Sequence, residues 1–529
     1  MKVTKLLLIV IILLAFTLRV YKLDSVPPSI SWDEAAFGYN AWTIANYGRD
    51  EYGKFFPLYF KSFGDDKHPV HIYITAIFVK LLGLNEFSTR LPSAVFGTLN
   101  VLLIYFLGKL FFKKEMIAFS ATLFLAISPY NIHFSRFNHE ANFALFFLML
   151  ALVLFFYSIK KHKKILVFSA LSFAICLLTY HSAKIVVPLI VLFLFIMYCR
   201  EILRDRADFI LSIFVATILL VTIFLNPQLL GIARVSQTSL SSEAAKETNL
   251  YEITKNEFLG KINLVSIQYS WHFMPQFLFI TGDKNPKLSS QTGEFYKIDA
   301  LFLIIGVISL LYKKSREGVS LLLWALIAPI PSSLVAESPH AARASFMMGS
   351  WHLISALGFY TLLIFFKNYY LKIGAFLIII SFLTISLFGY LNYYFGEYTK
   401  RYAIEWQYGM KQIVEYVKDH PEYHEIYVTD VRSQPYIYFI YYLQTPLPDY
   451  LNTVLYNRSE TNKSYNLVSY FDKYYFGGWD IVESMPNKGV LYIVTSSQYD
   501  GLKYRELFDI KRIIYYPNGT SAFYLVSAP

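Results

Sequence analysis

The feature that most constrains this chain is its series of long apolar runs, because each run approaches the length that a helix needs to cross a bilayer. Such a helix takes ~20 apolar residues, and somewhat fewer where flanking side chains reach the membrane surface. The predicted spans are residues 5–21, 91–111, 115–130, 142–159, 165–181, 184–199, 208–226, 298–313, 318–334, 345–366 and 371–392. The sequence therefore predicts a polytopic α-helical membrane protein with about eleven transmembrane helices.

The composition agrees with a membrane protein and gives no support to nucleic-acid binding. Of the 529 residues, 55% are hydrophobic and 16% are charged, whereas ~25% of a soluble domain is charged. The net charge is +11, but Lys and Arg stand in short clusters beside apolar runs rather than on one basic face. The two cysteines, Cys176 and Cys199, fall in apolar runs, so we predict no disulfide framework.

The connections between the runs alternate between basic and non-basic, which sets the predicted orientation. Lys and Arg concentrate in the cytoplasmic loops of membrane proteins. The basic connections are 108–114, 160–164, 200–206, 313–316 and 367–372, and the outer ones are 22–90, 128–140, 179–184, 227–297 and 332–343. The first run lacks a small-residue cleavage site and is predicted to stay as a span. We therefore place the N-terminus in the cytoplasm and the C-terminus outside.

One further apolar segment, 71–83, does not fit as a span. It is short, and if it crossed the membrane every later basic connection would face outward. Its start at Pro69 and its Lys80 suit a helix that lies along the membrane surface. We therefore predict juxtamembrane helices in the first outer loop.

The C-terminal part of the chain, residues 393–529, is less apolar and is predicted as a soluble extracytoplasmic α/β domain, after a transmembrane module at 1–392. We expect a helix over 403–419 and strands over 425–430, 490–496 and 512–516. The turn at Pro517-Asn518-Gly519 predicts that the last strand forms a hairpin with SAFYLV.

Unusual polar residues gather on the predicted outer side, at span ends and in loops. Ionisable groups near hydrocarbon are costly and mark functional sites. The candidate site residues are Asp33, Glu34, Lys67, His68, Arg136, Glu140, Tyr180, His181, Arg234, His272, His340 and Arg343. A carboxylate can activate an acceptor hydroxyl, and cations can stabilise a phosphate leaving group. Because the sequence has no Walker A loop and no Gly-rich dinucleotide turn, we expect a lipid-phosphate donor rather than a nucleotide.

Six segments carry a resemblance to a known family. They are WDEAAFGYNAW (32–42), KHPVHIYITAIFVKLLGLNEFSTRLPSAVFG (67–97), SPYNIHFSRFNHEANF (128–143), YSWHFMPQFLFITGD (269–283), PHAAR (339–343) and YFGEYTKRYAIEWQYGMKQ (394–412). In this order, the chain resembles the membrane glycosyltransferases of the C-type fold. It looks most like their protein O-mannosyltransferase-like branch, which is dependent on dolichyl- or polyprenyl-phosphate mannose and is related to the lipid A aminoarabinose transferases.

The resemblance implies a hexosyltransferase that moves a sugar, such as mannose, from a polyprenyl-phosphate donor to an acceptor hydroxyl with inversion. The acceptor would be a protein, a glycan or a lipid of the cell envelope. By resemblance, Asp33 is the catalytic base, Lys67 and Arg343 bind the donor phosphate, and Glu140 orients the acceptor or a metal. The chain departs from many relatives at Pro69-Val70, where they carry two prolines, and over 281–293, where they often carry a His.

Several of these residues also have a purely structural reading. Ser31 and Glu34 fit the capping box S-x-x-E, in which Glu34 caps a helix and Asp33 stays available. Glu140 would pair with Arg136, four residues earlier, if that segment were helical. For Tyr180, His181, Arg234 and His272 the structural reading is an interfacial aromatic or a headgroup contact.

Two other classes of protein remain as alternatives to an enzyme. A transporter or lipid flippase would show pseudo-repeats and broken helices in matched halves, and we find neither in the sequence. An envelope scaffold with a decayed site would not need to keep the acid, the Lys and the Arg. The sequence requires no cofactor, and a divalent cation held by outer acids stays open because no ligand spacing demands one. The sequence leaves open the sugar, the acceptor and the oligomeric state.

Overall fold

The computed structural model describes residues 2–63, 65–161, 163–231, 240–432, 434–457, 466–478 and 486–529. By internal contacts the chain divides into two compact units. The helical unit comprises residues 1–21 and 93–393, and the α/β unit comprises residues 22–92 and 394–529. Each unit is described by itself.

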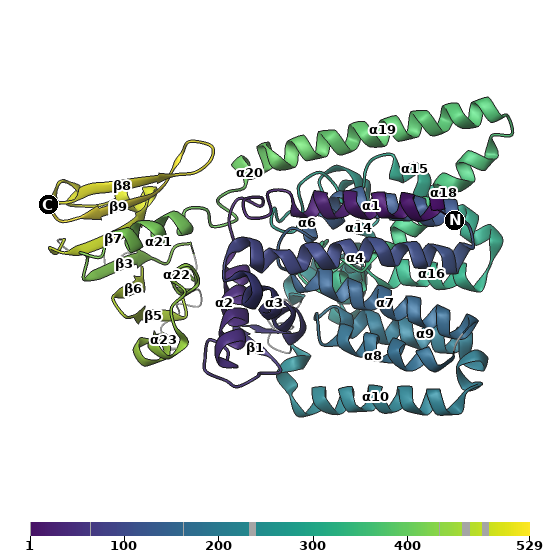
Figure 1. The fold of residues 1–529 in the computed structure, drawn as a ribbon, viewed down its shortest axis with the longest axis horizontal. Coiled ribbons are helices and arrows are strands. Elements are labelled where there is room, and N and C mark those ends of the chain that lie inside the picture. The colour runs from purple at the N-terminus through teal and green to yellow at the C-terminus, as the bar shows by residue number, and fades with distance from the viewer. Residues whose placement is uncertain are drawn as a thin grey trace. The chain divides into compact units, whose positions relative to one another are not determined.

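Long helices that run side by side make up most of the helical unit (Figure 1). They have these bounds: α1 Lys2–Val20, α4 Glu86–Phe112, α5 Glu115–Ile127, α6 Pro129–Phe134, α7 Glu140–Lys160, α8 Leu166–Leu177, α9 Ala183–Leu203, α10 Arg206–Leu225, α15 Asp299–Lys313, α16 Arg316–Ile327, α18 Met347–Phe365 and α19 Tyr369–Phe395. Shorter elements connect them: η1 Lys163–Ile165, η2 Pro227–Leu230, α12 Ser242–Lys246, α13 Asn249–Thr254, α14 Glu257–Trp271, the π-helical turn Gln276–Ile280 and α17 Ile330–Ser333.

Each predicted span overlaps one of these helices, and the span predicted over 318–334 is divided between α16 and α17. Within the described ranges, six helices are long and apolar enough to cross a membrane by length and composition: α4, α7, α9, α10, α18 and the helix that begins at Tyr369. The prediction of a polytopic α-helical membrane protein is therefore confirmed, while the number of eleven crossings stays a prediction.

Small residues allow α15 and α18 to cross closely. Gly306 of α15 faces the Ile354 carbonyl of α18, and Gly358 of α18 faces the Phe302 carbonyl of α15, so closely that a Cβ atom at either glycine would overlap that oxygen. Lipid tails are as apolar as side chains, so helices in a bilayer associate through close packing of this kind. The α15–α18 pair is therefore fixed by its glycines.

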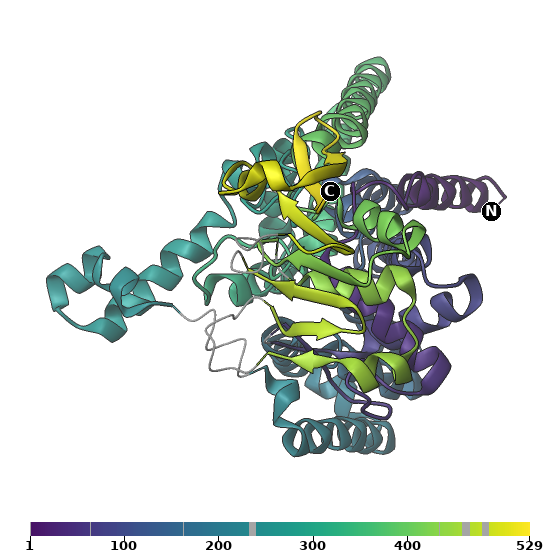
Figure 2. The same ribbon diagram turned by 90° about the vertical axis from the view of Figure 1, so that its left-hand side faces the viewer.

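The α/β unit is built on a seven-stranded sheet with the order β4-β5-β6-β3-β7-β9-β8 (Figure 2). β3 pairs in parallel with β6 and β7, and the other pairs are antiparallel. The elements are α2 Trp32–Tyr47, β1 Phe60–Ser62, β2 Asp65–Lys67, α3 Pro69–Leu82, α20 Glu397–Arg401, α21 Met410–Asp419, β3 Glu425–Thr429, α22 Pro435–Leu443, α23 Leu447–Thr453, β4 Leu455–Tyr456, β5 Val468–Phe471, β6 Tyr474–Gly477, β7 Val490–Thr495, α24 Ser496–Asp500, η6 Arg505–Leu507, β8 Asp509–Tyr515 and β9 Ser521–Ser527.

One core joins residues 22–92 to the C-terminal segment. Buried residues of α2 and α3 belong to the same hydrophobic cluster as those of α21, α22 and the central strands. The contact between α2 and α22 is close at Gly38, where a Cβ atom would come within 2.6 Å of the Tyr441 ring. A residue larger than glycine at this position would therefore push the two helices apart.

The structure confirms most of the predicted local elements and corrects one. The strands, the β8–β9 hairpin and a helix over 71–83 are present. The helix predicted over 403–419 is wrong in its first turns, because α21 begins at Met410 after a run of turns and a left-handed Gly409 with φ 109°. The position of α3 on the membrane surface and the domain boundary at 392 stay predictions, since contacts between residues do not locate a membrane.

Candidate active site

The N-terminus of α2 presents the acidic pair, and the predicted capping box is confirmed. Ser31 has an extended backbone and lies at the N-cap. The Glu34 amide donates a hydrogen bond to Ser31 Oγ at 3.3 Å, and the Ser31 amide donates one to Glu34 Oε2 at 3.0 Å. These reciprocal bonds satisfy two of the amides that a helix start leaves without partners.

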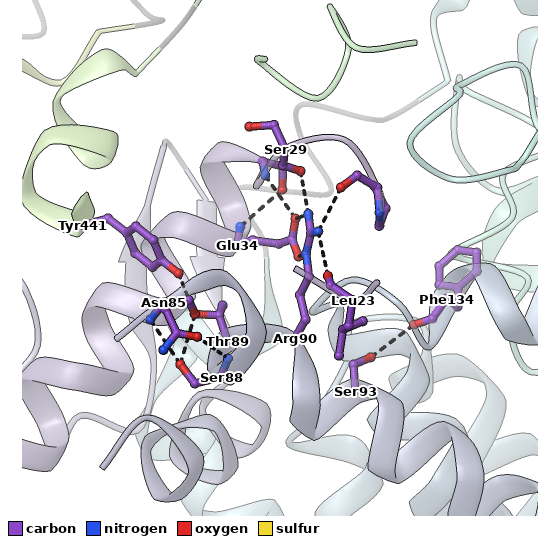
Figure 3. Close-up of polar contacts among 12 residues, drawn as sticks. Leu23, Ser29, Glu34, Asn85, Ser88, Thr89, Arg90, Ser93, Phe134 and Tyr441 are labelled. Carbon is purple, nitrogen blue, oxygen red and sulfur yellow. Dashed lines mark hydrogen bonds and ion pairs between the residues drawn. The ribbon is translucent and has the colours of Figure 1, made fainter. Parts of the chain in front are cut away.

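Glu34 also holds a buried arginine that the sequence did not single out. The Arg90 guanidinium donates to both Glu34 oxygens, from Nε at 2.8 Å and from Nη2 at 3.1 Å (Figure 3). It also donates to the carbonyl oxygens of Leu23, Pro27 and Ser29. Glu34 is fully buried and its carboxylate serves the cap and Arg90, so these contacts give it a structural role, while its predicted substrate contact stays a prediction.

Asp33 lies beside Glu34 but in a different environment. Its side chain is 37% exposed, and its Oδ1 is 3.5 Å from Lys67 Nζ, whose side chain is 14% exposed. Lys67 ends β2, in the short hairpin that pairs Phe60 with Lys67. The structure therefore brings together the acid and the lysine that were predicted as base and phosphate ligand.

The other candidate in the first outer loop, His68, follows Lys67 directly. It is buried and occupies the N-cap of α3, with Pro69 at the first helical position. This position fixes the turn between β2 and α3, and with it the end of the strand that carries Lys67.

In the helical unit, Arg136 closes the end of α1. Its guanidinium donates to the carbonyl oxygens of Leu18 at 2.9 Å, Arg19 at 3.1 Å and Tyr21 at 2.6 Å. The last carbonyls of a helix lack intrahelical partners, and a cation near them is favourable. These contacts give Arg136 a structural role as a C-terminal cap.

Glu140 begins α7 instead of continuing a helix from Arg136, so the predicted helical spacing of the two residues does not occur. His139 is the N-cap, and its Nδ1 accepts the Ala141 amide proton at 3.1 Å. Since an Nδ1 that accepts this proton carries none itself, the 3.9 Å approach of Glu140 Oε2 is an ion pair only if the imidazole is protonated and gives up the cap. The Tyr180 ring meets His139 edge-on at 5.8 Å.

Two further candidate histidines, His181 and His272, belong to the helical unit. His181 Nδ1 is 3.4 Å from Lys184 Nζ. His272 ends α14, and its Nδ1 is 3.0 Å from the Gln268 carbonyl oxygen. Burial lowers the pKa of His272 to about 4, so its imidazole is neutral at physiological pH. Arg234 lies outside the described residues.

His340 and Arg343 belong to one turn, which is fastened by an acid that the sequence analysis did not select. The Arg343 amide donates to His340 Nδ1 at 3.3 Å. Between them, the Ala341 amide donates to Asp283 Oδ2 at 2.7 Å. The Arg343 guanidinium is 4.0 Å from Glu337, whose side chain is exposed. Gly282 and Asp283 belong to one of the segments that carry the resemblance, but the hydrogen bond between Asp283 and the Ala341 amide is evident only from the fold.

Asp283 has a second acid beside it. The Asp283 amide donates to Glu294 Oε1 at 3.3 Å, and both side chains are buried. Burial raises the pKa of Asp283 to about 6, although the hydrogen bonds that it accepts from the Asn285 and Ala341 amides lower the pKa. Burial, together with the charge of Asp283, raises the pKa of Glu294 well above its ordinary value.

In the ranges that the structure covers, no group of three or more His, Cys, Asp or Glu side chains could hold a metal ion. The contacts described above bring Asp33 to Lys67 and bring His139 to Glu140 and Tyr180, and they place His340 and Arg343 in the turn whose Ala341 amide donates to Asp283.

The fold matches solved structures of membrane glycosyltransferases over almost the whole chain. ArnT from Cupriavidus metallidurans, solved bound to undecaprenyl phosphate, is 12% identical to this chain, and the two structures align with a TM-score of 0.56. The alignment covers 98% of this chain and 97% of ArnT. The oligosaccharyltransferase from Archaeoglobus fulgidus, tethered with an acceptor peptide, is 16% identical, with a TM-score of 0.52 over 98% of this chain and 74% of that one. This chain is therefore a polytopic membrane protein with the C-type glycosyltransferase fold.

Sequence comparison narrows this class. Residues 66–225 match the family described as dolichyl-phosphate-mannose-protein mannosyltransferase. A segment of 105 residues is 36% identical to YkcB of Bacillus subtilis (strain 168), a protein provisionally named a mannosyltransferase. That segment is 20% of this chain and spans only 14% of YkcB. The resemblance to the mannosyltransferase branch that the sequence motifs predicted is thus confirmed.

Proposed function

We propose that this protein transfers a sugar, a hexose such as mannose, from a polyprenyl phosphate to an acceptor hydroxyl on a protein, a glycan or a lipid of the cell envelope. The observation that carries the proposal is the pair of Asp33 and Lys67, 3.5 Å apart at the start of α2. An accessible carboxylate and a lysine at one place supply a base and a phosphate ligand.

The relatives support a lipid-phosphate donor. ArnT is solved with undecaprenyl phosphate, and the Archaeoglobus oligosaccharyltransferase AglB with a dolichol-phosphate and an inhibitory peptide. A further structure of the Archaeoglobus enzyme carries an acceptor peptide. Donors and acceptors of these kinds are the ones we propose for this chain.

In the proposed reaction, the acceptor hydroxyl oxygen bonds to the anomeric carbon while the bond from that carbon to the phosphate oxygen breaks. The hydroxyl proton passes to a carboxylate oxygen of Asp33, and the polyprenyl phosphate leaves with the electron pair of the broken bond. Attack on the face opposite the phosphate inverts the anomeric configuration. Lys67 and Arg343 balance the charge on the leaving phosphate.

In this proposal, the ion pair with Lys67 also positions the Asp33 carboxylate before the reaction. Before the donor arrives, Lys67 Nζ lies 3.5 Å from Asp33 Oδ1, so the ion pair holds the carboxylate in place at the start of α2. When the donor phosphate binds, it shares this ammonium, and Asp33 is left facing the acceptor. For Glu140 we propose a part in orienting the acceptor, from the N-terminus of α7.

We place the N-terminus in the cytoplasm and the α/β unit outside the cell, because the basic connections then face the cytoplasm. A topology reporter fused after Asn85 tests this, since it should read as extracytoplasmic. A cytoplasmic signal would mean that α3 crosses the membrane.

The decisive experiment is a transfer assay with the full-length protein in lipid nanodiscs and a panel of polyprenyl-phosphate sugars, with and without a chelator. Asp33→Asn should lower turnover by ~10²-fold or more, as expected for loss of a general base. Asp449→Asn, a matched change at an exposed acid of α23, should leave turnover unchanged. Near-normal turnover in Asp33→Asn with an unchanged thermal unfolding temperature would refute the assignment.

A further inference from the structure

An apolar groove runs between α8, α9 and α10 on the helical unit. Its volume is about 340 Å³, within the range of small-molecule sites. Its lining is almost entirely hydrocarbon and includes Ala170, Phe173, Val191, Phe195 and Ala216. The groove follows the helices along much of their length, which is the shape of a lipid chain rather than of a compact ligand.

A smaller polar cavity lies at the end of this groove that carries the basic connection 200–206. Its volume is about 40 Å³, which is enough for a water-sized group. Leu166 and Ile202 line both the cavity and the groove, so the two spaces adjoin. The charged lining of the cavity comes from Glu201, Arg204, Asp205 and Asp208.

These charged groups differ in the partners that the protein gives them. Arg316 Nη1 donates to Glu201 at 2.6 Å, and Asp205 is the N-cap of α10. Asp208 Oδ2 is buried, yet it accepts no hydrogen bond from the described residues. A buried acceptor without a donor costs free energy, so each such group calls for an explanation. Arg204 is exposed and forms no ion pair with any other residue that the structure describes.

We propose that this groove and cavity bind one membrane phospholipid whose headgroup carries both a phosphate and a primary ammonium. The acyl chain fills the apolar groove, the ammonium group donates to Asp208 Oδ2, and the phosphate meets Arg204. A phospholipid with a glycerol headgroup has no cation for Asp208, and a polyprenyl phosphate has none either.

The proposed lipid also accounts for the weak packing of α10. Only 11% of its most apolar stretch is buried inside the protein, compared with 61% for α7. A chain held between α8, α9 and α10 supplies the contacts that neighbouring helices do not, and it joins α10 to the rest of the unit. The proposed site is therefore structural, and its lining includes none of the residues proposed for sugar transfer.

Native mass spectrometry of the full-length protein in detergent tests the proposal with two probes of identical acyl chains, phosphatidylethanolamine and phosphatidylglycerol. The wild type should retain one phosphatidylethanolamine in preference to phosphatidylglycerol. Asp208→Asn should reduce this preference about tenfold, as for loss of one charged hydrogen bond. Asp208→Glu, which keeps the carboxylate, should restore most of it. Equal retention of the two lipids by the wild type would overturn the headgroup assignment.

Substitutions in α10 test whether the apolar groove holds the lipid chain. Ala216→Trp places an indole in the groove and should abolish retention of both lipids, whereas Ile218→Trp, on an exposed face of the same helix, should not. If Ala216→Trp does not fold, Ser212→Leu narrows the same groove with a smaller side chain. Unchanged retention of phosphatidylethanolamine in a folded groove variant would overturn the proposal.

Discussion

The buried pair of Glu34 and Arg90 yields the sharpest prediction on stability. Glu34→Gln keeps the helix cap, because Gln also serves at the third position of a capping box. It leaves the Arg90 guanidinium buried with three carbonyl acceptors but without the carboxylate to which it donates. Removing one partner of a buried ion pair costs ~3–5 kcal/mol, far more than a cap alone.

This cost translates into a measurable shift in unfolding temperature. The α/β unit that contains both residues has roughly 200 residues, a size at which each kcal/mol moves Tm by ~2–4 °C. We therefore expect Glu34→Gln to lower Tm by ~6–20 °C, measured from intrinsic tryptophan fluorescence during heating in nanodiscs. Asp33→Asn serves as the matched control and should stay within ~1 °C, since its side chain is partly exposed.

A double variant separates the charge effect from other damage. In Glu34→Gln with Arg90→Met, no buried charge is left without a partner, so the loss should be smaller than the sum of the two single losses by ~2 kcal/mol. Strictly additive losses, or a Tm of Glu34→Gln equal to that of the wild type, would refute the account of Arg90 as a charge held by Glu34.

Three other predictions concern donor binding, helix packing and pH. Lys67→Met should raise the KM for the lipid donor ~10-fold or more with little change in Tm, and an unchanged KM would remove Lys67 from the phosphate site. Gly358→Ala should unfold the helical unit at a clearly lower temperature because its Cβ overlaps a carbonyl of α15, while Gly374→Ala, which meets open space, should not. Because burial raises the pKa of Asp283 from 3.8 to about 6, its contribution to stability is present below about pH 4 and is lost as pH rises through 6. Between pH 4 and 7 the wild type should thus lose ~3 kcal/mol relative to Asp283→Asn, and parallel Tm profiles of the two proteins would contradict this.

The elements that the sequence predicted well are those set by neighbouring residues. The cap at Ser31 and Glu34 depends on a spacing of three, and the β8–β9 hairpin depends on a turn whose Gly519 has a φ of 88°. The start of α21 was missed because apolar spacing continues through 403–409, while the backbone forms turns there and φ is positive at Gln407 and Gly409.

The contacts that were not predicted join residues far apart in the chain. Arg90 reaches Glu34 across 56 positions, and Asp283 reaches the Ala341 amide across 58. No local pattern encodes such pairs, since the same arginine would read as a span-end anchor if Glu34 were elsewhere. The sheet order was beyond prediction for the same reason, because it depends on non-local strand pairing.

The packing of α2 against α22 has a consequence for biosynthesis. About 300 residues separate the two halves of the α/β unit, and at ~5–20 residues per second their synthesis takes ~15–60 s. During that time the helix with Asp33 has left the ribosome but its final partner has not been made. The apolar surface of α2 therefore stays without this partner until residues 435–443 have been made.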